Sequence, residues 1–261
     1  MTHATVEIEQ AGGVATIWMN RPELHNAFNP QLIDDLTTAF LELSGDPAAR
    51  VVVLAGRGKS FSSGADLNWM KEAGEQDFDA NFADAHRLAE MLRLLADLPK
   101  PTIARVHGAA LGGGMGLAAA CDICIAADNA SFTISEVRFG LIPATISPYV
   151  VRAVGARQAL RYFQTGERIT AHRARELGLV HETVEIEHLD DKVAKIAHSL
   201  SKGAPRALAA AKALVDYVDG RPIREKLVEE TARRIALARA GDEAREGLAA
   251  FAEKRPPGWS R

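Results

Sequence analysis

The chain has 261 residues, of which 47% are hydrophobic and 25% are charged. This length and composition predict one large domain or a domain with a smaller appendage, and they exclude a disordered chain, a collagen and a small disulfide scaffold. The formal net charge of −3 provides no basic surface, so we expect neither nucleic acid nor a membrane as a partner.

The first part of the chain predicts strands that alternate with helices. Two short β-branched runs within residues 4–19 flank a pair of glycines and predict a hairpin of two edge strands. The apolar run at 51–56 predicts a buried strand that leads into a loop at 58–64. Between them, Asn29 and Pro30 begin an amphipathic helix. Five apolar residues share one face of that helix: Leu32, Ile33, Leu36, Phe40 and Leu43.

Strand, turn and helix continue to alternate in the middle of the chain. A helix is predicted over 78–98, and a strand follows it at 102–108. The glycine-rich turn at 111–116 opens a short alanine-rich helix that ends near Cys121, and 122–128 is again a strand. We therefore predict an α/β fold that is a spiral of short ββα units rather than a doubly wound sheet.

After Gly178 the composition changes to that of consecutive helices. The segment 188–255 is rich in Ala, Leu, Lys, Arg and Glu and is interrupted by glycine-containing breaks. We divide the chain into a core over residues 1–195 and a helical C-terminal subdomain over residues 196–261. An apolar stripe on these helices predicts coverage by a second copy of the chain. The stripe consists of Leu227, Ile235, Leu237 and Leu248.

The cysteines and the start of the chain bear on its location. Cys121 and Cys124 are the two cysteines, and a chain of this size needs no disulfide, so a reducing compartment is expected. The opening segment MTHATVEIEQ lacks the apolar core of a secretory signal. The longest uncharged stretch, at 108–121, is shorter than the ~20 residues of a membrane helix. We predict a cytoplasmic protein.

Two glycine-containing turns that follow strands are candidates for an oxyanion site. The turn LGGGMG opens a helix, whose N-terminus presents unpaired N–H groups with partial positive charge. The turn FSSGADL follows the buried strand at 51–56. Two backbone donors from separate loops suit an acyl oxygen whose charge grows in an enolate transition state. A tight packing turn is the alternative for LGGGMG, and Ser62 and Ser63 are expected to be solvated because GxSxG is absent.

Glu136 is a candidate for proton transfer because apolar residues flank it. Partial burial among them would raise its pKa, whereas a surface ion pair with Arg138 is the alternative. The flanking residues are Ile134, Val137, Phe139 and Leu141. The two cysteines have CxxC spacing without a second pair, so we expect buried core thiols. The histidines show no paired ligand spacing, and no metal is expected.

Taken together, these motifs resemble the crotonase family, also called the enoyl-CoA hydratase/isomerase superfamily. Six motifs occur in order along nearly the whole chain: NRPELHNAFN, FSSGADL, PTIARVHGAALGGGMGLAAACDICIAAD, FTISEVRFGLIP, TGERITAHRARELGLV and DEAREGLAAFAEKRPP. The resemblance implies a crotonase-like spiral with a C-terminal helical trimerisation region, and a homotrimer or a hexamer built as a dimer of trimers. It implies an acyl-CoA thioester as substrate and no separate cofactor, since coenzyme A is part of the substrate.

The resemblance also implies roles for individual residues. The two backbone donors that hold the thioester oxygen fall on Ala65 and Gly113, and Glu136 is the catalytic carboxylate. Contacts with the acyl-CoA are implied for residues of the same turns and for a C-terminal element that, in relatives, reaches the coenzyme A of an adjacent subunit. These residues are Leu24, His25, Ala27, Gly64, Asp66, Leu67, Gly112, Gly116, Phe251 and Lys254.

One position departs from the hydratase pattern. Typical hydratases of the family carry a first glutamate where this chain has Gly116, so Glu136 alone remains. A single glutamate resembles the Δ3-Δ2 enoyl-CoA isomerases. The segment SEVRFGLIPATISPYVVRAVG nevertheless resembles a bacterial branch that includes 3-methylglutaconyl-CoA hydratases of leucine degradation and isohexenylglutaconyl-CoA hydratases. We therefore predict a hydratase for a branched or dicarboxylyl acyl-CoA, with an isomerase or a catalytically silent acyl-CoA-binding scaffold as alternatives.

The missing glutamate leaves open what positions the water. The candidates are Ser147, Tyr149 and a distal carboxylate of the substrate itself. A substrate carboxylate would need a cationic partner. The chain offers three candidates for that partner: Lys71, Arg138 and Arg152.

Overall fold

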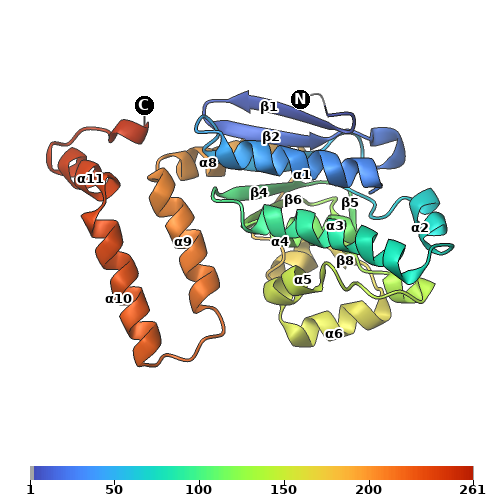
Figure 1. Ribbon diagram of the computed structural model, residues 1–261. Helices are drawn as coiled ribbons and strands as arrows, with labels where there is room; N and C mark the ends of the chain where they lie inside the picture. The colour runs from blue at the N-terminus through green and yellow to red at the C-terminus, as the bar shows by residue number, and fades with distance from the viewer. Residues whose placement is uncertain (1–2, 261) are drawn as a thin grey trace.

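A mixed sheet of six strands forms the centre of the protein, whose computed structural model describes residues 3–260 (Figure 1). The strands lie in the order β1, β2, β3, β4, β6, β9. The first pair is antiparallel, and the other neighbours are parallel. Their bounds are Val6–Ala11 for β1, Val14–Met19 for β2, Val51–Gly56 for β3, Thr102–Val106 for β4, Ile123–Ala127 for β6 and Glu182–Val184 for β9.

A smaller sheet consists of β5 (Ala109–Leu111), β7 (Ser131–Thr133) and β8 (Ile169–Thr170). The chain passes from β4 to β5, forms helix α4 (Gly113–Ala120), and then passes from β6 to β7. The pairs β4–β5 and β6–β7 therefore each contribute one strand to each sheet, and α4 lies between them. This arrangement confirms the predicted α/β spiral of ββα units.

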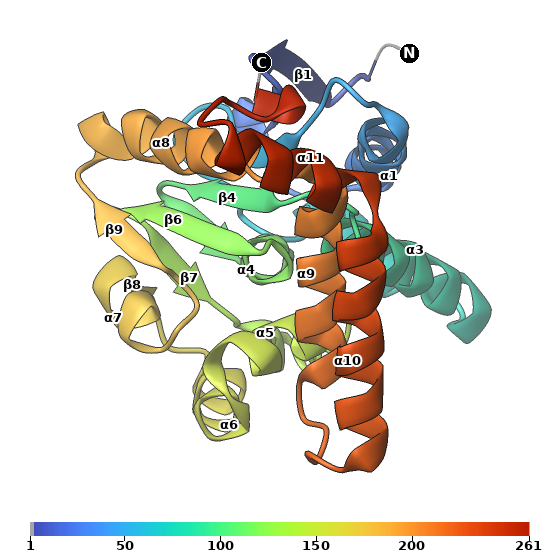
Figure 2. The same ribbon diagram turned by 90° about the vertical axis from the view of Figure 1, so that its left-hand side faces the viewer.

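Helices cover both faces of the large sheet and continue beyond it. On one face α8 packs against β3, β4 and β6, and on the other face α1, α3 and α4 enclose the larger core (Figure 2). The remaining bounds are Pro30–Gly45 for α1, Leu67–Ala73 for α2, Phe78–Ala96 for α3, Ser147–Val154 for α5, Ala156–Thr165 for α6, Ala171–Glu176 for α7, Leu189–Ser201 for α8, Pro205–Val218 for α9, Glu225–Ala240 for α10 and Asp242–Ala252 for α11.

The strand β3 is buried on both faces, as its continuous apolar sequence predicts. Its alternate residues point to opposite sides of the sheet, so Val51 and Val53 belong to the core under α8. Val52 and Leu54 belong to the larger core on the other face. The end of β3 is thereby fixed between two packed layers, and the loop that follows it starts from a rigid position.

The helix α1 forms where its cap residues predict it. The Asn29 side chain accepts a hydrogen bond from the Leu32 N–H, and Pro30 occupies the first helical position. All five residues of the predicted apolar face are buried. The sequence thus determines both the start of this helix and the side that it packs against the sheet.

The N-terminal hairpin forms as predicted, but only one of its strands lies at an edge. β1 pairs with β2 alone, whereas β2 also pairs in parallel with β3, from Val14 opposite Val51 to Met19 opposite Gly56. The alternate residues Ala15, Ile17 and Met19 of β2 are fully buried. The expectation of two edge strands was wrong because the hairpin inserts its second strand beside β3.

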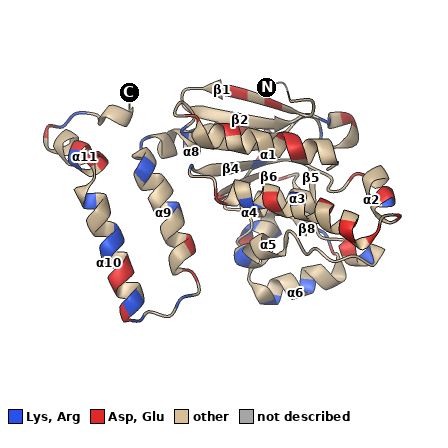
Figure 3. Ribbon diagram, in the orientation of Figure 1, with Lys and Arg blue, Asp and Glu red and all other residues tan. Residues whose placement is uncertain are grey.

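The C-terminal helices α9, α10 and α11 form an arm beside the body (Figures 1 and 2). The division at residues 195 and 196 falls inside α8, which packs on the sheet, so the arm itself begins at α9. Charged side chains of both signs line α10 (Figure 3). Ile235, Leu237 and Leu248 are exposed, and their coverage by a second copy stays a prediction. Within residues 3–260, no helix has the length and apolar character needed to cross a membrane.

The turn between β2 and α1 is fastened to the loop after β3 through one buried amide. Asn26 is fully buried, and its Oδ1 accepts a hydrogen bond from the Arg21 N–H. Its Nδ2 donates to the carbonyl oxygens of Arg57 and Ser60, each at 2.9 Å. Since the loop after β3 leads directly into the turn FSSGADL, Asn26 holds the start of that turn against the segment before α1.

Replacement of Asn26 by Ala is expected to lower the free energy of unfolding by about 3 kcal/mol, because three buried backbone groups lose their partner. Chemical denaturation measures this change. The matched control is Asn20→Ala, since Asn20 donates to the exposed side chain of Glu7 and should cost less than about 0.5 kcal/mol. Equal costs for the two variants would contradict the assigned role.

Candidate active site

The turns FSSGADL and LGGGMG lie against each other. Ser62 forms a parallel bridge with Ala110, in which the Ser62 N–H donates to Ala109 O at 3.0 Å and the Leu111 N–H donates to Ser62 O at 2.9 Å. Gly64 has φ of +85°, and a Cβ there would lie 2.9 Å from Leu111 O. This close approach of two backbones requires glycine at position 64. The two loops therefore meet, as the oxyanion hypothesis requires.

The N–H of Ala65 faces the space between these loops. The Phe28 N–H donates to Gly64 O at 2.7 Å, and the Asp66 N–H donates to Phe28 O at 2.8 Å, so both neighbours of Ala65 pair with Phe28. Successive peptide groups of an extended segment point to opposite sides, which turns the Ala65 N–H away from Phe28. Within residues 3–260 this N–H has no backbone acceptor, and Ala65 itself is exposed.

The N–H of Gly113 is the second free donor. Gly113 is the first residue of α4, and its N-cap Gly112, with φ of +48°, offers no side-chain cap. The N–H groups of a first helical turn lack intrahelical acceptors and carry the positive end of the helix dipole. A Cβ on Gly113 would lie 2.5 Å from the Phe28 ring, and one on Gly114 would lie 2.6 Å from Ser62 O. Tight packing and free donors thus coincide in the same turn.

The Glu136 carboxylate stands beside this helix N-terminus. Its Oε1 lies 3.0 Å from the position that a Cβ would take on Gly112. Its Oε2 is buried and has no hydrogen-bond partner among the described residues. Burial raises the pKa of Glu136 above its ordinary value, as predicted, although three of the four apolar flanking residues are exposed. Arg138 donates instead to Gly166 O at 2.8 Å, so it is not the ion-pair partner of Glu136.

The absence of a side chain at position 116 is built into the packing of the site. Gly116 is buried in α4, and a Cβ there would overlap the Cγ2 methyl of Ile146 and lie 2.8 Å from its Cβ. Ile146 is itself 2% exposed and belongs to the main core. Its side chain fills the space next to α4, so no carboxylate fits at position 116 and Glu136 is the carboxylate beside this turn.

Two of the side chains considered for holding water have other roles. The Ser147 hydroxyl donates to Ala144 O at 2.8 Å, within the turn that starts α5. Burial raises the pKa of Tyr149, and Asp97, the C-cap of α3, is the charged group with the largest further effect on its phenol. No described contact joins either hydroxyl to Glu136.

The cationic candidates also differ in availability. Arg152 forms an ion pair with Asp216 at 3.4 Å, and the Arg138 guanidinium is bound to backbone carbonyls. Lys71 is exposed on α2, near the C-terminal end of that helix. Of the three, Lys71 alone has neither an ion pair nor a side-chain hydrogen bond among the described residues.

The residues implied to contact coenzyme A lie along the turn between β2 and α1 and along the FSSGADL loop. Leu24 is 45% exposed, and His25 adopts φ of +52° with its Nδ1 3.1 Å from the Ser60 hydroxyl. Ala27 is buried, so its backbone rather than its side chain borders the site. Leu67, at the start of α2, is 80% exposed.

Asp66 and Arg21 join these two segments. The Asp66 carboxylate accepts from the Asn68 N–H, which caps α2, and pairs with Arg21 at 3.1 Å. Arg21 also donates to Ala27 O at 2.5 Å. Arg21 was missed in the sequence, although it stands inside NRPELHNAFN, because its partners come from a loop far along the chain. Its role is to hold the segments that carry the site.

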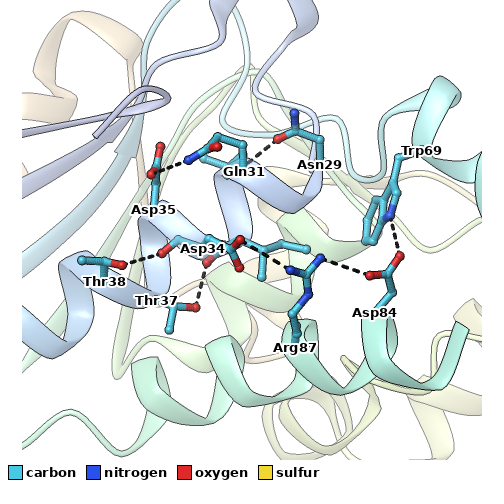
Figure 4. Close-up of polar contacts among 11 residues, drawn as sticks. Asn29, Gln31, Asp34, Asp35, Thr37, Thr38, Trp69, Asp84 and Arg87 are labelled. Atoms are coloured by element: carbon cyan, nitrogen blue, oxygen red, sulfur yellow. Dashed lines mark hydrogen bonds and ion pairs between the residues drawn. The ribbon is translucent and has the colours of Figure 1, made fainter. Parts of the chain in front are cut away.

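A hydrogen bond and two ion pairs link α2, the helix that follows Ala65, to its neighbours. The Trp69 indole N–H donates to Asp84 of α3 at 3.1 Å, and Arg87 of α3 also contacts Asp84 at 3.1 Å (Figure 4). The same Arg87 reaches Asp34 of α1 at 3.5 Å. These contacts join α2 to α3 and α3 to α1.

Phe251 and Lys254 lie apart from this cluster within one chain. Both are at the end of α11, on the arm, whereas α2 lies at the opposite end of the body (Figure 1). Phe251 is 84% exposed, and Lys254 adopts φ of +54°. Their contact with the coenzyme A of an adjacent subunit stays a prediction.

Two expectations about small side chains have different outcomes. Ser62 is fully buried rather than solvated, since its hydroxyl donates to Asn26 O at 2.8 Å and accepts from the Gly64 N–H at 3.3 Å. The error arose because loop composition does not reveal that this loop packs inside the body. Cys121 and Cys124 are buried free thiols, as predicted, and burial raises the pKa of Cys124 to about 12. In residues 3–260 no cluster of His, Cys, Asp and Glu could hold a metal ion.

Residues 9–261 match the protein family described as Enoyl-CoA hydratase/isomerase. The chain belongs to this family. It is similar to the crystal structure of an enoyl-CoA hydratase from Shewanella pealeana, with 40% identity, a TM-score of 0.96 and coverage of 98% of this chain and 96% of that one. An enoyl-CoA hydratase/isomerase from Marinobacter aquaeolei has 35% identity, a TM-score of 0.92 and coverage of 98% and 99%.

A third relative is named for a different acyl-CoA. The hydroxycinnamoyl-CoA hydratase-lyase of Pseudomonas fluorescens is 36% identical over 218 residues, which are 80% of this chain and 76% of that protein. Membership in the family makes this protein an enzyme and makes the cluster of Ala65, Gly113 and Glu136 its candidate acyl-CoA site.

The contact between Gly116 and Ile146 is testable by a double-mutant cycle. Gly116→Ala should lower the free energy of unfolding by about 2 kcal/mol, because the new methyl overlaps the buried Ile146 side chain. In the presence of Ile146→Gly the same change should cost at least about 1 kcal/mol less. Thermal and chemical denaturation measure the cycle. Gly45→Ala, at a position with open space around it, is the control and should be neutral; additive costs at 116 and 146 would refute the contact.

Proposed function

We propose that the protein adds water to the double bond of an α,β-unsaturated acyl-CoA through an enolate held by two backbone N–H groups. The observation that carries this proposal is the convergence of Ala65, Gly113 and Glu136. Two unpaired donors from separate loops and one desolvated carboxylate meet at the contact of Gly64 with the Leu111 carbonyl.

The two N–H groups would stabilise the negative charge that develops on the thioester oxygen. They are oriented before the substrate binds, by the bridge to Phe28 and by the start of α4, so no reorganisation is needed during the reaction. The partial positive charge of the α4 N-terminus adds to the same effect. The enolate that forms has its α-carbon next to the carbonyl carbon, within the region that Glu136 borders.

Glu136 can serve both proton transfers of a hydration. As the water oxygen bonds to the β-carbon, its proton passes to the Glu136 carboxylate, and the electrons of the double bond move to the thioester oxygen. Protonated Glu136 then returns a proton to the α-carbon as the enolate collapses. Burial raises the pKa of Glu136 above its ordinary value, which suits a group that both accepts and returns a proton.

The acyl group is proposed to be branched or dicarboxylyl, as in 3-methylglutaconyl-CoA of leucine degradation. The support is the resemblance of the IPATISPYV segment and the way its Ile146 fills the space at Gly116. The exposed Lys71 on α2 is the cation proposed to face a distal carboxylate. The aromatic acyl group named for the Pseudomonas fluorescens relative is the competing possibility that substrate profiling resolves.

A complete site is proposed to require a homotrimer or a dimer of trimers. The exposed apolar residues of α10 and α11 supply a surface for this association, and Lys254 of one copy is proposed to meet a phosphate of coenzyme A bound to another. With both thiols free and buried, the cytoplasm is the proposed location.

Isomerisation of a 3-enoyl-CoA to the 2-enoyl-CoA is the second candidate. It is favoured by the single carboxylate, because moving a proton between the α and γ carbons needs one acid-base group and no positioned water. Products distinguish the two reactions, since only hydration forms a hydroxyacyl-CoA.

Replacement of Glu136 by Gln is expected to lower kcat by a factor on the order of 10² to 10⁴, with a small change in KM, because the amide cannot carry the proton. Hydration of 3-methylglutaconyl-CoA and crotonyl-CoA and isomerisation of a 3-enoyl-CoA are assayed in parallel. For the wild type, kcat should fall as the pH is lowered, with a midpoint above the ordinary glutamate value of 4.5.

Glu187→Gln is the control. Glu187 is exposed and follows β9 in the chain, so this variant should leave kcat unchanged. Conjugated product without hydroxyacyl product would assign the isomerase reaction instead. Acyl-CoA binding without turnover of any enoyl-CoA would make the protein a silent scaffold and refute the proposal.

A further inference from the structure

The two donors of the site are joined through one residue that neither motif contains. Phe28 lies between the turn after β2 and the N-cap of α1, and it is 1% exposed. Its backbone forms the parallel bridge with Ala65. Its ring lies against Gly113, with Cε2 and Cδ2 at 2.5 and 2.8 Å from the position that a Cβ would take there.

We infer that Phe28 is the positioning residue of the oxyanion hole, which sets the separation of the Ala65 and Gly113 N–H groups. This inference rests on the proposed function. It assigns Phe28 no contact with the substrate. Its role is to act on the backbone of both donors at once.

The backbone bridge between Phe28 and Ala65 fixes the direction of the first donor. The Phe28 N–H and O pair with the residues on either side of Ala65, at 2.7 and 2.8 Å. Those two bonds leave the Ala65 peptide no freedom to rotate toward Phe28, so its N–H stays turned to the site. Any shift of the Phe28 backbone moves this donor with it.

The ring fixes the position of the second donor. Since glycine has no side chain, the backbone of Gly113 rests directly on the edge of the aromatic ring, which also packs in the main core. A packed interior yields little to compression, so the ring prevents the start of α4 from moving toward α1. A side chain that lacks the Cε and Cζ atoms would leave this backbone unsupported.

Phe28 is in turn held on both sides. The preceding Ala27 carbonyl accepts from Arg21 at 2.5 Å, and the following Asn29 caps α1. The residue therefore transmits the rigid position of α1 and of the β2 turn to both donors. An ordinary core phenylalanine contacts neither donor, and Phe40 of α1, also 1% exposed in the same core, is such a residue.

The test compares Phe28→Leu with Phe40→Leu. Phe28→Leu removes the ring atoms next to Gly113 and leaves the backbone bridge to Ala65. We expect kcat to fall roughly 10-fold or more, less than the 10²- to 10³-fold loss for removal of a whole donor. KM should stay within about threefold, and Phe40→Leu should keep kcat within about twofold at a temperature where both variants are folded.

A spectroscopic readout separates positioning from stability. The infrared band of the ¹³C-labelled thioester carbonyl of butyryl-CoA, which has no double bond to react, shifts to lower frequency when two donors polarise it. Phe28→Leu should lose a large part of the shift seen with the wild type, and Phe40→Leu should retain it. Phe28→Met, of similar volume, is measured in the same way and should also lose part of the shift.

A wild-type band position and a wild-type kcat in Phe28→Leu would overturn the inference. Equal effects of Phe28→Leu and Phe40→Leu would overturn it too, and so would unfolding of both Phe28 variants while Phe40→Leu stays folded, because the role is then one of stability. Failure of the proposed function looks different: the wild type turns over no enoyl-CoA, while the carbonyl shift of butyryl-CoA still reports on Phe28.

Discussion

The close approach of the Gly64 backbone to the Leu111 carbonyl is the contact on which the site depends. Glycine at position 64 allows two loops of the spiral to come into backbone contact. This contact brings the Ala65 N–H near the start of α4. One loop follows the buried strand β3 and the other follows β5, which pairs with β7, so both loops start from fixed positions. The proposed oxyanion hole consists of backbone groups alone, so its donors depend on chain path and not on side-chain identity.

The chemistry then divides between the backbone and one carboxylate. In the proposed mechanism the backbone donors hold the thioester oxygen of the acyl-CoA, while Glu136 alone transfers protons at the acyl carbons. Ile146 fixes that division, since its side chain takes the room that a second carboxylate at position 116 would need. The choice between hydration and isomerisation consequently lies in how water and the acyl group are held around Glu136, not in the oxyanion hole.

The parts of the fold that could be predicted are those with local causes. The start of α1 follows from Asn29 and Pro30, and the burial of β3 follows from its apolar run. The glycine turns also indicated the oxyanion donors, since free helix N–H groups and close backbone approach are properties of the turn itself.

The parts that could not be predicted depend on contacts between distant segments. The insertion of β2 beside β3, the burial of Ser62 and the hold of Arg21 on Asp66 each join residues that no local pattern connects. The same is true of Gly116, whose lack of a side chain is explained only by Ile146, from the turn before α5. Sequence motifs located the donors and the carboxylate, but the residues that hold them in place emerged from the packing.

Exchange of the α-hydrogens of butyryl-CoA in D₂O tests the central claim most directly, because it requires an enolate and Glu136 but neither water addition nor double-bond movement. The account predicts that the wild type incorporates deuterium at the α-carbon, detected by mass spectrometry or NMR, and that Glu136→Gln does so at least about 100-fold more slowly. Bound butyryl-CoA that keeps its α-hydrogens on the wild-type enzyme, or equal exchange by the Gln variant, would contradict it.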